Sequence, residues 1–148
     1  MSKALALTIS HSIFIARPRQ DVWDFTQDYS KRQSWDSAVL NARVINTESP
    51  RKIKLSMRGG TTMTFVYKLD DRPRKTTLAT EDVHSSIIHS GGGSWNYEEV
   101  HGGTRWTQTN TLLLRDRFFT PFLAPWFRRI FQRQTVMAMK KAKRVLES

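Results

Sequence analysis

Residues 13–25 read IFIARPRQDVWDF and mark the point where one periodicity gives way to another. Up to residue 15, apolar side chains recur at every second position, which is the period of a half-buried β-strand: Leu5, Leu7, Ile9, Ile13 and Ile15. Beyond it, Pro18 can open a helix, because the first helical turn needs no backbone donor there, and Asp21 complements the helix dipole. The stretch therefore predicts a long first strand that leads directly into a short helix.

The middle of the chain is predicted to be a series of strands. Ser30 and Gln33 have the spacing of a capping box, which favours a second short helix over residues 30–35. Period-two alternation between turn residues predicts further strands, at residues 39–45, 53–57, 63–69, 76–81 and 105–114, and one in two pieces at 87–89 and 94–100. The three glycines 91–93 separate those pieces and indicate a bulge or a sharp bend.

The last part of the chain is predicted to be one long amphipathic helix. Thr120 and Pro121 form an N-cap and first-turn pair, but Pro125 follows, so the regular helix is expected to begin at Pro125. Residues 125–147 would then span about 34 Å at about 1.5 Å per residue. One face recurs at intervals of three and four: Leu123, Phe127, Ile130, Gln134, Met137, Ala138, Ala142 and Val145.

These elements together predict an α+β fold in a single domain over residues 1–148. Consecutive strands joined by short turns form an antiparallel meander. The seven-stranded sheet would curve around the long C-terminal helix, with two short helices after the first strand. Because a straight helix cannot fill the concave side of a curved sheet everywhere, a cavity is expected between them.

Composition restricts the functions of the chain. It has no cysteine, which excludes disulfides and thiolate chemistry and fits a reducing cytoplasm. The apolar run in residues 1–7 is too short for a signal sequence, and no stretch approaches the roughly 20 apolar residues of a membrane span. The formal charge is +11, and the nine basic and two acidic residues from Arg115 to Ser148 account for +7 of it. This basic segment would attract anionic lipid, nucleic acid or an acidic partner, or is simply a solvated helix face.

Several motifs resemble those of a known superfamily. A first strand runs through Ala16 and Pro18 into a helix with the pair Val22 and Trp23, and Trp35 follows the second short helix. Residues 103–107, GTRWT, resemble the turn that opens the last strand of that superfamily. The chain is similar to the START-like (SRPBCC, Bet v 1-like) superfamily, and most to its polyketide cyclase/dehydrase and lipid transport family. The resemblance covers nearly the whole chain and implies a helix-grip fold with a hydrophobic cavity, but it does not name a ligand.

Aromatic and polar side chains on the predicted sheet are candidates for lining the cavity. Trp106, Gln108, Asn110 and Leu112 share one face of the last strand, and buried amides there would need a partner such as a ligand carbonyl or hydroxyl. In the alternative orientation, Arg105 and the threonines of that strand would point inward. The predicted ligand-binding residues are Met57, Phe65, Tyr67, Trp95, Tyr97, Trp106, Gln108, Asn110, Phe127, Ile130 and Met137.

Support for catalysis is weaker. A histidine titrates near neutrality, which makes His89 the candidate general acid or base and Glu81 its candidate partner; a surface histidine is the alternative. No compact cluster of His, Asp and Glu predicts a metal site, and no phosphate loop or dinucleotide fingerprint predicts a cofactor. We therefore expect neither a metal nor a cofactor.

Residues 118–127 read FFTPFLAPWF and gather aromatic side chains around two prolines, just before a basic stretch. Part of this segment would cap the cavity, and the rest would contact an anionic bilayer. The residues predicted for this contact are Phe118, Phe122, Trp126, Arg128, Arg129 and Arg133. A lid buried against the first strands is the alternative, and nucleic-acid binding is not favoured because no recognition module is present.

The sequence thus favours a protein that binds a hydrophobic small molecule, such as a lipid, a polyketide-like compound or a quinone-like compound. A carrier needs only a cavity with an opening. A cyclase or dehydratase would also need an acid and a base inside the cavity, and the sequence does not place such a pair. The third hypothesis is an interaction module that docks through the basic helix. We expect a cytoplasmic protein, which in an alternative interpretation also contacts a membrane peripherally.

Overall fold

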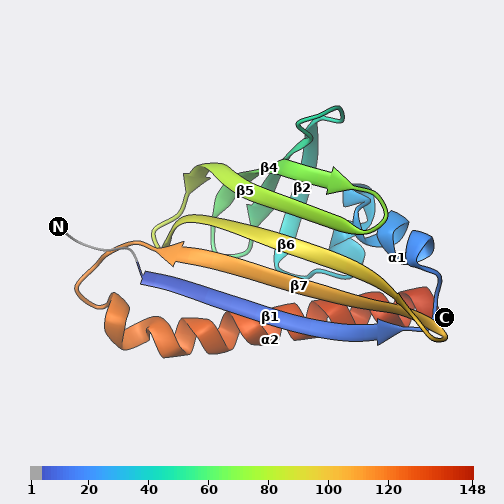
Figure 1. The fold of residues 1–148 in the computed structure, drawn as a ribbon. Helices are drawn as coiled ribbons and strands as arrows, with labels where there is room; N and C mark the ends of the chain where they lie inside the picture. The colour runs from blue at the N-terminus through green and yellow to red at the C-terminus, as the bar shows by residue number, and fades with distance from the viewer. Residues whose placement is uncertain (1–4) are drawn as a thin grey trace.

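The curved sheet and the long helix are both present in the computed structural model, which describes residues 5–148 (Figure 1). Residues 1–4, the start of the run at residues 1–7, lie outside the described part. Seven antiparallel strands form one sheet in the order β1-β7-β6-β5-β4-β3-β2. The strands are β1 (Leu5–Ile15), β2 (Val39–Asn46), β3 (Lys52–Met57), β4 (Thr62–Asp71), β5 (Lys75–His84), β6 (Ile88–Val100) and β7 (Gly103–Leu114). The helices are α1 (Arg19–Thr26), the short 3₁₀ helix η1 (Tyr29–Ser34) and α2 (Thr120–Glu147), and the predicted helix-grip fold is confirmed.

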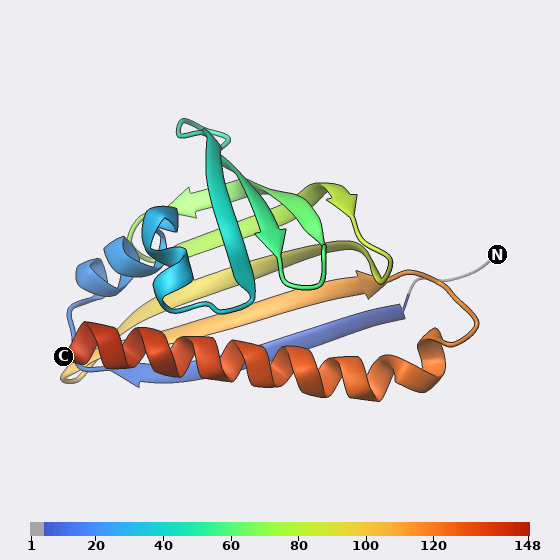
Figure 2. The same ribbon diagram turned by 180° about the vertical axis from the view of Figure 1, so that it is seen from behind.

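Helix α2 lies on the concave side of the sheet and runs alongside β1 (Figures 1 and 2). Its C-terminal end is fixed to the connection between β1 and α1. There the Ala16 backbone N–H donates to Glu147 Oε2 at 2.8 Å, and Arg17 Nε donates to the Leu146 carbonyl oxygen at 2.6 Å. Within residues 5–148, no helix combines the length and the apolar character that crossing a bilayer requires.

Two predictions about helix ends are wrong. Asp28 caps η1 in place of Ser30, because the Asp28 carboxylate accepts the Ser30 backbone N–H at 3.0 Å. Helix α2 begins at Thr120 and not at Pro125. The Thr120 hydroxyl donates to the Arg115 carbonyl oxygen at 2.8 Å, which fixes the turn that starts the helix. Pro125 lies inside this helix, where its missing N–H removes one backbone hydrogen bond.

Strand β6 passes through its three glycines without a break, contrary to the two predicted pieces. Its pairing with β5 nevertheless ends at Gly92, and the Thr80 hydroxyl accepts the Gly91 N–H at 2.8 Å in place of the next ladder bond. The sheet therefore opens between β5 and β6 beyond this point. At Gly93, a Cβ atom would lie 2.4 Å from Asn110 Oδ1, so the absence of a side chain makes room for Asn110.

The buried apolar side chains form two clusters. The first includes Leu55, Leu114 and Phe127, and it joins β3 and β7 to the N-terminal half of α2. The second is mainly aromatic and packs on the C-terminal half of α2: Trp23, Trp35, Trp95, Tyr97, Trp106, Met139 and Ala142. The two clusters do not fill the concave side of the sheet, and unfilled space remains between the clusters.

Candidate ligand-binding cavity

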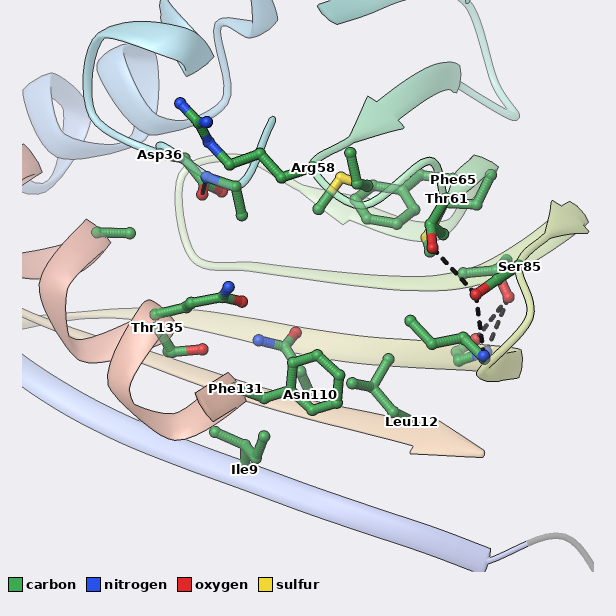
Figure 3. A pocket seen from close by; sticks show the side chains of 18 of the residues that line it. Ile9, Asp36, Arg58, Thr61, Phe65, Ser85, Asn110, Leu112, Phe131 and Thr135 are labelled. Atoms are coloured by element: carbon green, nitrogen blue, oxygen red, sulfur yellow. Dashed lines mark hydrogen bonds between the residues drawn. The ribbon is translucent and has the colours of Figure 1, made fainter. Parts of the chain in front are cut away.

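A cavity of about 280 Å³ lies between the concave face of the sheet and α2 (Figure 3). Ligand pockets in proteins typically measure about 300–1,000 Å³, so this volume suits one small molecule. Residues of both core clusters contribute to its wall. Exposed residues in the wall mark where it meets solvent: Arg58, Gly59, Ser86 and Gln134.

Most of the wall is apolar, because alternate residues of each strand face the helix. Met57 and Phe65 come from β3 and β4, and Leu112 comes from β7. Phe131 closes the wall from the α2 side (Figure 3). An apolar molecule would be removed from water on several sides here.

A row of polar side chains crosses the apolar wall on β6 and β7. Trp95 Nε1 donates to Asn110 Oδ1 at 3.4 Å, and Asn110 Nδ2 donates to Gln108 Oε1 at 3.1 Å. On the opposite face of β7, threonine hydroxyls pair with β1, as Thr107 does with Ser12 at 2.6 Å. The predicted inward orientation of Gln108 and Asn110 is therefore confirmed.

A buried ion pair lies in the wall next to the aromatic cluster. Arg32 is 6% exposed, and its Nε donates to Asp36 Oδ2 at 3.0 Å. The guanidinium carbon lies 4.6 Å from the ring centre of Trp35 and 4.8 Å from that of Trp95. Burial, the largest single influence, lowers the pKa of Arg32, but the charge and hydrogen bond of Asp36 together with the nearby tyrosines raise this pKa above its ordinary value. The wall therefore carries a permanent cation.

The structure brings together five of the residues predicted to bind ligand. Met57, Phe65, Trp95, Gln108 and Asn110 all line the cavity. Six lie outside its lining: Tyr67, Tyr97 and Trp106 are buried in the core, as is Phe127, whereas Ile130 is half-buried and Met137 is 58% exposed.

The two buried tyrosines have partners inside the protein. Tyr67 pairs with the Tyr29 hydroxyl, and the Tyr97 hydroxyl accepts from Gln27 Nε2 at 2.8 Å. Burial raises the pKa of both Tyr67 and Tyr97 above the ordinary value of a phenol. Their hydroxyls are paired within the core, and neither tyrosine lines the cavity.

The two weak catalytic candidates also lie outside the lining. His89 is exposed, with its Nδ1 at 3.2 Å from the Ser90 hydroxyl. Glu81 is exposed and forms an ion pair with Lys52 at 3.1 Å. Sequence reasoning missed Arg32 and Asp36, although a basic and an acidic residue at an i, i+4 spacing beside Trp35 are visible in the sequence.

The sequence matches the family model for polyketide cyclase / dehydrase and lipid transport over residues 6–143. The chain belongs to this family. A comparison with curated proteins gave no match. Among solved structures, the fold is similar to TTHA0849 from Thermus thermophilus, with a TM-score of 0.83 and 15% identity over 95% of this chain and 97% of that one.

Two other solved structures have a similar fold. Zhui aromatase/cyclase from a Streptomyces species has a TM-score of 0.81 and 14% identity, over 97% of this chain and 94% of that one. A START superfamily protein from Mycobacterium smegmatis has a TM-score of 0.76 and 7% identity, over 95% of this chain and 97% of that one. At these identities the likeness concerns the fold alone.

The segment before α2 and its first turns form an exposed aromatic tip, defined here as Phe118, Phe122 and Trp126. These side chains are 88%, 81% and 56% exposed, respectively. The loop that carries the tip is anchored on the cavity rim, where Arg117 Nε donates to the Ser86 carbonyl oxygen at 3.2 Å. This family member therefore presents apolar surface to solvent beside an opening of its cavity.

Proposed function

We propose that this family member binds a hydrophobic small molecule in the cavity and acts as its carrier or binding protein. The observation that carries the proposal is a cavity of about 280 Å³ whose wall is mainly apolar and includes a few fixed polar groups. Apolar wall supplies affinity and the polar groups set orientation, which is the usual composition of a small-molecule site. We assign direct contacts to Met57, Phe65, Trp95, Gln108 and Asn110.

The wall fits a binding protein better than a cyclase or dehydratase. Proton transfer would need an acid and a base within reach of the same ligand. Asp36 is the one carboxylate that residues 5–148 contribute to the lining, and it is held by Arg32. His89 and Glu81 lie outside that lining.

Binding can be tested with the neutral fluorophore N-phenyl-1-naphthylamine, whose emission rises in apolar surroundings. Thr135 lines the cavity from α2, and Thr135→Trp would place an indole inside it. We expect the wild type to bind the fluorophore and this variant to bind it at least about tenfold more weakly, since lost volume removes apolar contact. Organic extraction of purified wild type, followed by mass spectrometry, would identify a bound ligand.

Met137→Trp is the matched control for this experiment. Met137 lies on the same helix, is 58% exposed and is outside the lining, so the same substitution there should leave the fluorophore affinity unchanged. A wild type that binds neither this fluorophore nor any co-purifying compound would refute the proposal. Equal fluorophore affinities of wild type and Thr135→Trp would mean that the fluorophore binds outside the cavity.

We also propose that the aromatic tip makes peripheral contact with an anionic membrane. Three large apolar side chains that are more than half exposed are unfavourable in water, and amphipathic surfaces with aromatic and basic residues insert at the bilayer interface. Arg129 and Arg133 follow the tip on α2 and are exposed, as is Arg128. These cations would meet anionic head groups.

Vesicle sedimentation tests the membrane proposal. The wild type should sediment with phosphatidylglycerol vesicles more than with phosphatidylcholine vesicles, and Phe118→Ser/Phe122→Ser should lose most of this binding. Ile45→Ser is the control, because Ile45 is an exposed apolar residue, at 50%, that lies on the edge strand β2 and away from the tip. Equal loss in both variants, or none in either, would contradict contact through the tip.

A further inference from the structure

Arg32 is the most deeply buried charged side chain in the cavity wall, and its donors are not all used. Among residues 5–148, its side chain makes a hydrogen bond only to Asp36, from Nε. Nη1 is buried and has no partner among these residues. A guanidinium has five N–H donors, and a buried donor without an acceptor is strongly unfavourable. Arg32, which lines the cavity, therefore has a buried donor that no group of the described residues accepts.

The surrounding protein groups do not supply that acceptor. The second oxygen of Asp36 already accepts the Ala38 backbone N–H at 3.2 Å. The other close neighbours of the guanidinium are aromatic rings, with centres 4.6 to 5.3 Å from its carbon: Tyr29, Trp35 and Trp95. Ring faces stabilise a cation but do not replace a hydrogen-bond acceptor. The rings hold the guanidinium in place while part of its edge stays unpaired.

The charges of the wall favour an anionic acceptor over a neutral one. The charged residues in the lining are Arg32, Arg58 and Asp36, which together leave one positive charge. Arg58 is exposed, and its Nε donates to the Ser37 carbonyl oxygen at 2.6 Å, so water and backbone already serve it. One negative charge on a ligand would make the wall neutral, and Arg32 is the cation that lacks an acceptor.

We propose that the molecule bound in the cavity carries a carboxylate on its apolar body and that Arg32 anchors this carboxylate. The inference rests on the proposed function, because it names the ligand class of the same cavity. A carboxylate can accept two parallel N–H bonds from one guanidinium, and charge-assisted bonds of this kind are stronger than neutral ones. An ester of the same acid offers an acceptor without the charge.

The experiment measures displacement of N-phenyl-1-naphthylamine by matched pairs of compounds: decanoic acid with methyl decanoate, and 2-naphthoic acid with methyl 2-naphthoate. At pH 7 we expect the acid of at least one pair to bind about tenfold to a hundredfold more tightly than its ester. In Arg32→Met, which keeps much of the apolar stem, this preference should disappear while the fluorophore still binds.

Two further variants keep the test decisive if Arg32→Met does not fold. Asp36→Asn removes the carboxylate that competes for the guanidinium, so the acid should bind several-fold more tightly than to wild type. Arg58→Met removes the exposed cation of the wall and should leave most of the acid preference in place. A preference that disappears in Arg58→Met and persists with wild-type strength in Asp36→Asn would assign the anion to Arg58 and overturn the proposal.

The outcomes separate this inference from the proposed function. Failure of wild type to bind the fluorophore, together with the absence of any co-purifying compound, would refute ligand binding itself. Fluorophore binding with equal affinity for acid and ester in both pairs would leave the carrier function standing and overturn the carboxylate anchor. Acid preference that depends on Arg32 supports both.

Discussion

Gly93→Ala should damage the cavity wall through one contact. A Cβ atom at this position would lie 2.4 Å from Asn110 Oδ1, whereas the Thr109 carbonyl oxygen is 3.3 Å away. The Asn110 side chain would yield first, because the backbone of β7 is held by its ladders with β1 and β6. Its rotation would break the hydrogen bonds to Trp95 and Gln108.

The size of the effect follows from those two bonds. Each is worth about 0.5–1.5 kcal/mol, so the free energy of unfolding should fall by about 1–3 kcal/mol. In a domain of this size, each lost kcal/mol lowers Tm by about 2–4 °C, so a decrease of about 2–12 °C is expected. Urea titration monitored by tryptophan fluorescence gives the free energy directly.

A double-mutant cycle with Asn110→Ala tests the assigned cause. Asn110→Ala removes the atom that the new Cβ meets, so Gly93→Ala should cost less than about 0.5 kcal/mol in that background. The coupling energy between the two positions should then be about 0.5–3 kcal/mol. Additive losses would refute the reasoning, because they would mean that the new methyl group strains the backbone and not the amide row.

Three further predictions concern stability. Tyr97→Phe removes the hydroxyl that accepts from Gln27 at 2.8 Å, and calorimetry should report a loss of about 1–3 kcal/mol; a loss below about 0.5 kcal/mol would contradict this role. Leu114→Ala, at a fully buried position, should lower the free energy of unfolding by about 2–5 kcal/mol in urea, whereas Leu40→Ala, at a 47% exposed position, should change it by less than about 1 kcal/mol. The backbone N–H of Ala16 donates to Glu147 and lowers the pKa of this carboxyl group. Between the lowered pKa and the ordinary glutamate pKa, the folded state therefore binds fewer protons than the unfolded state. Wild type should therefore be more stable than Glu147→Gln near pH 7 and lose this advantage progressively as pH falls below the ordinary glutamate pKa and through the lowered pKa of the folded state, and equal stabilities near pH 7 would contradict the shift.

The predictable parts of the site are those fixed by strand alternation. Trp106 and Leu112 are apolar and require burial. Because side chains alternate along a strand, Gln108 and Asn110 must then face the same side as these two residues. The hydroxyl pairs between β1 and β7 occupy the other side. The helical stripe is less informative, because a spacing of three and four covers a wide arc. Met137 belongs to that arc by sequence, yet the way α2 lies on the sheet leaves it 58% exposed.

Arg32 could not be assigned to the cavity from local pattern. It lies in a short 3₁₀ helix with polar neighbours in sequence, where an arginine is usually solvated. Its burial depends on Trp95, which lies on β6 and reaches it only in the folded sheet. Long-range packing of this kind leaves no periodic trace in the sequence.

The aromatic tip and the cavity share one structural element, the connection between β5 and β6. Ser85, Ser86 and Ile87 line the cavity, and the loop that carries the tip donates hydrogen bonds to the carbonyl oxygens of this connection, with Arg115 N to Ile87 at 2.7 Å and Arg117 Nε to Ser86 at 3.2 Å. The loop that carries the tip is therefore joined to the cavity rim by hydrogen bonds from both its backbone and its side chains. A carrier that inserts this tip into a bilayer would place the rim against the apolar phase, so its ligand would leave without crossing water. Because the proposed carboxylate anchor lies at the Asp36 end and Ser85 lies at the opposite end in Figure 3, the apolar body of the ligand would point toward that exit.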